Sequence, residues 1–152
     1  MNRLGKSLTT CVLAFAIAAL GCTARTPPRV VLPGAAPVEL AELLDRYPLA
    51  ADQPVRAERL AVTAELSYHL VQVRPGAGER PHLHAQHDLV VLLLLGQGTQ
   101  WINRQPAAVR AGDTLAIPAG ASHYFVNTGN TPAAALVIFS PPHDGSDQVS
   151  TE

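Results

Sequence analysis

From residue 55 onward, short apolar segments alternate with turn residues, and this pattern predicts β-strands. The predicted strands cover residues 55–62, 66–73, 82–84, 89–95, 99–103, 107–110, 114–117, 123–127 and 133–139. Glycine, proline or asparagine separates them, as at Arg74-Pro75-Gly76 and at Pro118-Ala119-Gly120. Many short strands at this spacing are typical of an all-β sandwich or barrel.

The flanking segments predict different structures. Residues 38–47 place Leu40, Leu43 and Leu44 on one helical stripe, which predicts a short amphipathic helix. Residues 22–37 contain four prolines and little periodicity, so we expect an extended, proline-rich tether. Residues 144–152 are polar, and we expect a flexible tail.

Residues 1–21 have the organisation of a signal peptide. Arg3 and Lys6 precede an uncharged, mostly apolar stretch that is shorter than the roughly 20 residues needed to cross a membrane. This stretch ends in Ala19-Leu20-Gly21-Cys22, which resembles a bacterial lipobox. The resemblance implies a lipoprotein: Cys22 would carry lipid and hold the protein at the cell envelope, facing the periplasm. An uncleaved anchor and an ordinary secretion signal are the alternatives.

Composition excludes several function classes. Eleven basic and 12 acidic residues give a net charge of -1, which argues against a nucleic-acid partner. Lys6, the sole lysine, and Cys11 would leave with the signal peptide, and Cys22 would carry lipid. Schiff-base chemistry, a P-loop lysine and a cysteine nucleophile are then excluded. Histidines, carboxylates, hydroxyls or a bound metal must supply any chemistry.

Histidines form the most distinctive candidate site. His82 and His84 lie two residues apart on a predicted strand and therefore point to the same face. His87 follows closely, and His123 lies about 40 positions later. Two imidazoles on one face and a third from another strand could bind a divalent metal. We expect His69 in the core or at a dimer face and His143 in a surface turn.

Two spaced motifs surround these histidines. The first reads Gly76-x5-His82-x-His84-x4-Leu89-x6-Gly96, and the second reads Gly112-x5-Pro118-x-Gly120-x2-His123-x3-Asn127. They resemble the two motifs of the cupin superfamily over roughly residues 66–140, and the first departs only at Leu89, where the family has a metal-binding glutamate. The resemblance implies a small single-domain bacterial cupin at residues 38–143. Its fold would be a double-stranded β-helix (jelly-roll) barrel, with His82, His84 and His123 as metal ligands.

The departure at Leu89 leaves several possibilities open. Three imidazoles alone could hold the metal, leaving its full charge to attract an anionic ligand. His87 could turn inward as a fourth ligand, a bulge could bring Asp88 into the glutamate's place, or no metal is bound. An all-imidazole site suits zinc, iron, manganese, copper or nickel better than magnesium or calcium.

Strand 89–95 is apolar throughout, which predicts that both of its faces are covered. A helix, another sheet or a second subunit could cover the outer face, and we expect a homodimer.

Three functions remain possible. One is a lipid-anchored module that binds metal and a small-molecule ligand, another is a metal-dependent, oxygenase-like enzyme, and the third is a purely structural barrel. An enzyme needs a second acid or base in the site. The sequence indicates no lysine, cysteine or secure carboxylate inside the barrel, so binding is favoured and catalysis stays open.

Overall fold

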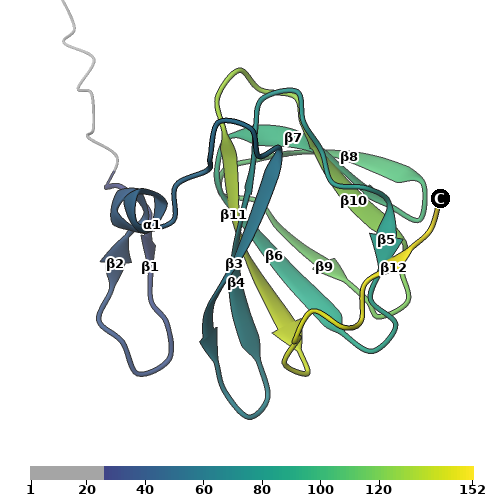
Figure 1. Cartoon of the computed structure of the whole chain (residues 1–152), viewed down its shortest axis with the longest axis horizontal. Coiled ribbons are helices and arrows are strands. Elements are labelled where there is room, and N and C mark those ends of the chain that lie inside the picture. The colour runs from purple at the N-terminus through teal and green to yellow at the C-terminus, as the bar shows by residue number, and fades with distance from the viewer. Residues whose placement is uncertain (1–25) are drawn as a thin grey trace, which may run out of the picture.

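Two five-stranded antiparallel sheets face each other in residues 26–152, the part of the chain that this computed structural model describes (Figure 1). The first sheet has the order β3-β4-β11-β6-β9, with bounds Val55–Val62, Ser67–Val73, Ala133–Ser140, Asp88–Leu95 and Thr114–Ile117. The second has the order β12-β5-β10-β7-β8, with bounds Val149–Ser150, His82–Leu83, His123–Asn127, Gln97–Ile102 and Gln105–Arg110. The prediction of an all-β, jelly-roll barrel is confirmed.

One connection is tighter than the sequence indicated. The predicted strands at 89–95 and 99–103 leave residues 96–98 for a turn, yet β6 ends at Leu95 and β7 begins at Gln97. Gly96 alone connects them, with a φ of +83° that side-chain-bearing residues rarely adopt. A Cβ atom there would also lie 2.8 Å from the Cα of Ala133. Glycine is therefore required at this corner.

The strand alternation in β6 has the predicted phase. Leu89, Val91 and Leu93 are buried and join an apolar cluster inside the barrel. Val90, on the opposite face, is 41% exposed. The position that departs from the cupin motif therefore faces the interior.

The N-terminal elements cover part of the barrel's outer surface. Helix α1 (Leu40–Arg46) lies within the predicted helix, and β1 (Arg29–Val30) pairs with β2 (Val38–Glu39). The prediction of an extended tether is therefore wrong from residue 29 onward. The physical reason is burial: Val30 and Leu43 pack with Leu70 of β4 in a second apolar cluster. A helix of the same chain thus covers part of the outer face. This is one of the three possibilities that the sequence left open.

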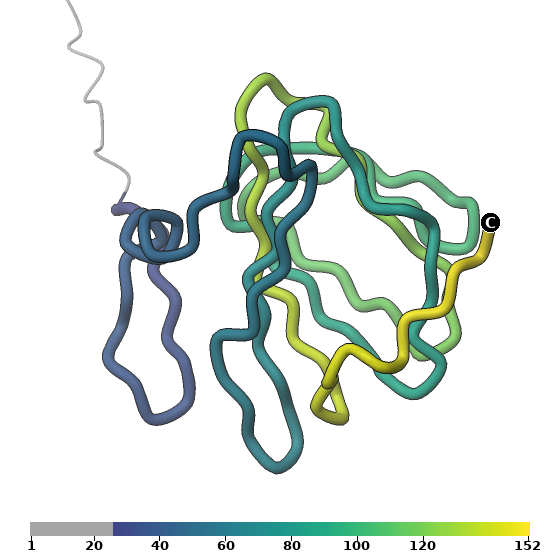
Figure 2. Tube along the Cα trace, in the orientation of Figure 1, coloured from purple at the N-terminus to yellow at the C-terminus, as the bar shows by residue number. Residues whose placement is uncertain are grey.

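The C-terminal segment is folded against the barrel, which corrects the prediction of a flexible tail. β12 pairs with β5, and the yellow trace follows the barrel's side in Figure 2. The Asp147 carboxylate accepts hydrogen bonds from the backbone N–H of Gln86 and from His87. Polar contacts, which no hydrophobic pattern records, hold this segment in place.

The expected signal peptide and the lipidation site at Cys22 lie outside the described residues. Within residues 26–152, the sole helix is too short to span a membrane.

Candidate metal centre

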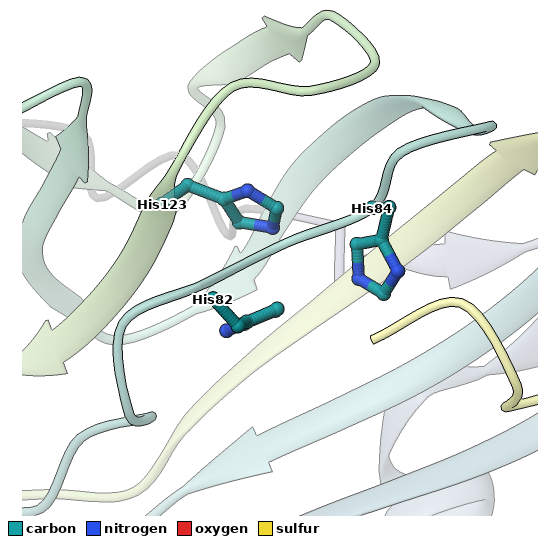
Figure 3. Close-up of side chains that lie close together, drawn as sticks. All are labelled: His82, His84 and His123. Atoms are coloured by element: carbon teal, nitrogen blue, oxygen red, sulfur yellow. The ribbon is translucent and has the colours of Figure 1, made fainter. Parts of the chain in front are cut away.

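Two strands bring the three predicted histidine ligands together. His82 begins β5, His84 follows directly after it, and His123 begins β10. β5 and β10 are antiparallel, and His82 is the register partner of His123. The ring centroid of His82 lies 4.4 Å from that of His123 and 5.2 Å from that of His84. The ring centroids of His84 and His123 are 5.5 Å apart. One nitrogen from each ring lies within 4.8 Å of the others, around the shared space visible in Figure 3.

Backbone carbonyls set the orientation and tautomer of all three rings. The Nδ1 atoms of His82, His84 and His123 lie 2.7, 2.7 and 2.9 Å from carbonyl oxygens of Arg80, Asp147 and Ala121, respectively. A carbonyl only accepts hydrogen bonds, so Nδ1 carries the proton and Nε2 keeps a free lone pair. Metal-bound histidines are held in the same way in proteins.

Burial keeps two of these rings neutral. Desolvation is the main cause that lowers the pKa of His84 and of His123 to about 4. Both imidazoles are therefore uncharged at pH 7, the state in which a histidine binds a metal.

The structure excludes one of the alternatives left open at Leu89. Leu89 is buried and lines the cavity, as the strand alternation predicts. Asp88 is exposed, and its Oδ1 accepts a hydrogen bond from the backbone N–H of Ala119 at 2.8 Å. The hypothesis that a bulge turns Asp88 inward is therefore wrong, because β6 stays regular at this point and pairs in register with β9 and β11.

His87 does not complete the first cluster. It is buried with His84 and His143, and one nitrogen from each of these rings lies within 4.8 Å of the others. The expectation of a surface turn at His143 is wrong, because the chain after β11 folds back over the barrel. There His143 stacks on Phe139 with ring centroids 4.6 Å apart. Neither cupin motif reaches residue 143, so the sequence offered no signal for this contact.

A cavity of about 410 Å³ adjoins the histidines and lies between the two sheets. Most of its wall is apolar and comes from the barrel core, including Leu89, Val91, Leu93, Ile117 and Phe125, the residues predicted for it. His69, Gln100 and Arg59 add polar side chains to the lining. The cavity therefore combines three converging imidazoles with a mostly apolar wall.

Glu79 is a carboxylate that the sequence analysis did not find inside the barrel. It lines the cavity, and its Oε2 accepts a hydrogen bond from the backbone N–H of Phe125 at 3.1 Å. Desolvation raises the pKa of Glu79, against the opposing effects of nearby His82 and of this hydrogen bond. Glu79 lies in the loop before β5, where alternation cannot assign a side chain to a face.

One protein family and several known proteins are similar to this chain. The family described as "Cupin domain" matches residues 69–139. An uncharacterized protein of Aquifex aeolicus (strain VF5) is 35% identical over 100 residues, which are 66% of this chain and 80% of that protein. Oxalate oxidase GF-2.8 of Triticum aestivum is 29% identical over 94 residues, which are 55% of this chain but only 41% of the wheat enzyme.

A solved structure from Thermotoga maritima, described as a predicted oxalate decarboxylase, is also similar. Its TM-score is 0.54 and its sequence identity is 25%, over 57% of this chain and 80% of that one.

Proposed function

Because the chain belongs to the cupin superfamily, we propose that it binds a divalent transition metal through His82, His84 and His123 and holds a small-molecule ligand beside that metal. One observation carries this proposal: three buried imidazoles, each fixed by a carbonyl at Nδ1, offer Nε2 to a common space. These residues fit a metal because hydrogen bonds to carbonyls orient all three rings. In addition, the imidazoles of His84 and His123 are neutral, since burial lowers their pKa values. Zinc, iron, manganese, copper and nickel all suit nitrogen donors.

The charge of the site favours an anionic ligand. Leu89 replaces the family's glutamate, so the three histidines would leave the charge of a bound metal uncompensated. Arg59 lines the same cavity and adds positive charge. The wheat relative is an oxalate oxidase, and a carboxylate is therefore the ligand class we propose. The apolar part of the cavity leaves room for a hydrocarbon body attached to that carboxylate.

Metal analysis of the purified protein tests this proposal. The parent should retain a transition metal in near-stoichiometric amount, and a His82→Ala/His84→Ala variant should contain only traces. Circular dichroism shows whether the variant is folded. Equal trace amounts in parent and folded variant would reject the metal site.

Glu79 favours a second candidate function, a metal-dependent, oxygenase-like enzyme. A bound metal would supply Lewis-acid or redox chemistry, and Glu79 would hold or accept a proton in the same cavity. Desolvation, the main cause of its raised pKa, favours the protonated form. The test incubates metal-loaded protein with small carboxylates, oxalate among them, and follows their consumption. Catalysis would be supported if the parent consumes a carboxylate and Glu79→Gln abolishes this turnover without changing the metal content. A binding protein would be supported if the carboxylate binds reversibly and is recovered unaltered.

We also propose that the protein is lipid-anchored at the bacterial envelope through Cys22 and faces the periplasm. Support comes from the lipobox-like sequence that ends at Cys22. A Cys22→Ser variant should lose both lipid labelling and membrane association. Fractionation of this variant with the membrane, like the parent, would reject the anchor.

A homodimer remains our proposal for the assembly. Val90 of β6 is 41% exposed on the face opposite Leu89, and a second subunit would cover it. Sedimentation should show a dimer that Val90→Asp weakens, and a monomer in the parent would reject the proposal.

A further inference from the structure

A second group of three buried imidazoles adjoins the first. It consists of His84, His87 and His143, and one nitrogen from each ring lies within 4.8 Å of the others. The ring centroid of His143 lies 4.7 Å from that of His84 and 4.9 Å from that of His87. These residues come from the end of β5, the loop before β6 and the segment after β11, so the group is assembled by folding.

The donors of this group are available to a cation. His87 Nδ1 lies 2.7 Å from a carboxylate oxygen of Asp147, so it donates the hydrogen bond and leaves Nε2 free. His143 is 7% exposed, and its buried Nδ1 atom has no hydrogen-bond partner. Buried polar atoms are almost always hydrogen-bonded. A bound cation would give this nitrogen the partner that the protein does not supply.

The charge around the group also favours a cation. The Asp147 carboxylate accepts hydrogen bonds from the Gln86 backbone N–H and from His87. This negative charge is in direct contact with His87. The rings of the first cluster instead donate their Nδ1–H hydrogen bonds to neutral backbone carbonyls.

We propose that His84, His87 and His143 form a second binding position for a divalent transition metal, which one ion occupies in alternation with the first. This inference rests on the proposed function, because His84 belongs to both groups. Its Nδ1 is engaged by the Asp147 carbonyl, so a single nitrogen remains to bind a metal. In Figure 3, one ring nitrogen of His84 is turned toward His82 and His123 and the other toward the C-terminal segment. The nitrogen turned toward the C-terminal segment is the protonated Nδ1, so His84 joins the second group only after its ring turns over and presents Nε2 there, and it completes one group at a time.

The second position adjoins the solvent-exposed rim of the cavity. Asp144, Gly145 and Gln148 follow His143 in the chain, are exposed and line the same cavity. His143 is thus the member of the second group next to these exposed residues in the chain. The arrangement thus suits a position through which metal is loaded and released.

Metal titration of paired variants tests this inference, with Co²⁺ and Zn²⁺ as probes. The His82→Ala/His123→Ala variant keeps only the second group, and the His87→Ala/His143→Ala variant keeps only the first. A fourfold variant combines all of these changes. The parent and both double variants should each bind a single ion. Loss of the position with the higher affinity should weaken binding to the affinity of the position that remains, and loss of the other should weaken it by no more than about twofold. The fourfold variant should bind no ion. The Co²⁺ absorption spectra of the two double variants should differ, because the ligands differ.

The outcomes separate this inference from the proposed function. If the parent binds metal and a folded His82→Ala/His123→Ala variant binds no more than the fourfold variant, the second position is rejected and the first stands. If His87→Ala/His143→Ala binds no metal while the other pair does, the first position is rejected instead. Two ions bound to the parent would reject alternation. Should the alanine pair fail to fold, His82→Leu/His123→Leu, which preserves side-chain volume, replaces it.

Discussion

The carbonyls that hold the three imidazoles differ in how they depend on sequence. His82 and His123 each donate to the carbonyl two residues earlier, at Arg80 and Ala121. These two bonds are local and use only backbone acceptors, so side-chain changes at Arg80 or Ala121 leave the acceptor in place. His84 depends on Asp147, which lies 63 residues away. The orientation of His84 therefore requires the C-terminal segment to be docked.

Restoring the family's glutamate should change both stability and metal binding. Leu89 is 5% exposed and pairs in register with Phe139, whose ring centroid is 5.1 Å from that of His84. Leu89→Glu buries a carboxyl group and should destabilise the metal-free protein by about 3 kcal/mol. Zinc should restore more stability to this variant than to the parent, because the carboxylate then has a cation partner. Thermal melting with and without zinc measures both effects.

Leu93→Glu is the matched control, because Leu93 is equally buried and lines the same cavity four residues further along β6. It should be destabilised similarly, but zinc should not rescue it beyond the gain of the parent. Equal rescue of both variants would contradict a metal position near Leu89.

Buried neutral histidines should make the metal-free protein sensitive to acid. Burial is the main cause that lowers the pKa of His69, His84 and His123 from 6.5 to about 4. Between these values the unfolded chain binds more protons than the folded one, so stability falls as the pH falls. The free energy of unfolding should be constant above about pH 6.5 for these groups and decline toward about pH 4. Urea unfolding across this range provides the measurement.

His69→Gln isolates one part of this pH dependence. His69 bonds to Ser67 and belongs to neither histidine group. The variant should take up about one proton fewer on unfolding in this pH window, with unchanged metal binding. A slope identical to that of the parent would contradict the assignment of His69 as a buried neutral ring.

At the scale of elements, the features that were predicted correctly are those that local sequence patterns determine. β3, β9 and β10 have the predicted bounds, because alternation and turn residues define them. The convergence of His82, His84 and His123 followed from two motifs of fixed spacing. Glu79, His143 and Asp147 were missed, because each lies in a loop or tail where no periodicity assigns a face. Their positions result from long-range polar contacts, which the hydrophobic pattern does not contain.

The C-terminal segment should act as part of the metal site. The Asp147 side chain anchors it by accepting hydrogen bonds from Gln86 and His87, and its backbone orients His84. Asp147→Ala removes the anchor, and metal affinity should fall about 10- to 100-fold, as for other residues that orient metal ligands. Isothermal titration with Zn²⁺ measures the loss.

Asp144→Ala provides a matched control in the same segment. Asp144 is exposed, and its Oδ1 accepts hydrogen bonds only from Ser146 in the described structure. Its replacement should leave Zn²⁺ affinity within about twofold of the parent. Equal losses in the two variants would show that general charge, not anchoring, matters.

Over the whole molecule, one sheet separates two apolar clusters with different roles. The inner cluster, which includes Leu89, Ile117 and Phe125, supplies the cavity wall. The outer one joins Val30 and Leu43 of the N-terminal elements to the back of the same sheet. The site lies wholly on the inner side. Stability supplied by the N-terminal elements should therefore be separable from the properties of the site.

Leu43→Ala tests this separation. Leu43 of α1 is 2% exposed in the outer cluster, and its truncation should cost about 3 kcal/mol of unfolding free energy through lost burial and a cavity. Leu44→Ala, at a half-buried neighbour, should cost about 1 kcal/mol. Both variants, while folded, should bind zinc with the parent's affinity, because the histidines are held by β5, β10 and the C-terminal segment. Urea unfolding and zinc titration measure the two quantities, and a large loss of affinity in folded Leu43→Ala would mean that the sheet transmits changes from its outer face to the site.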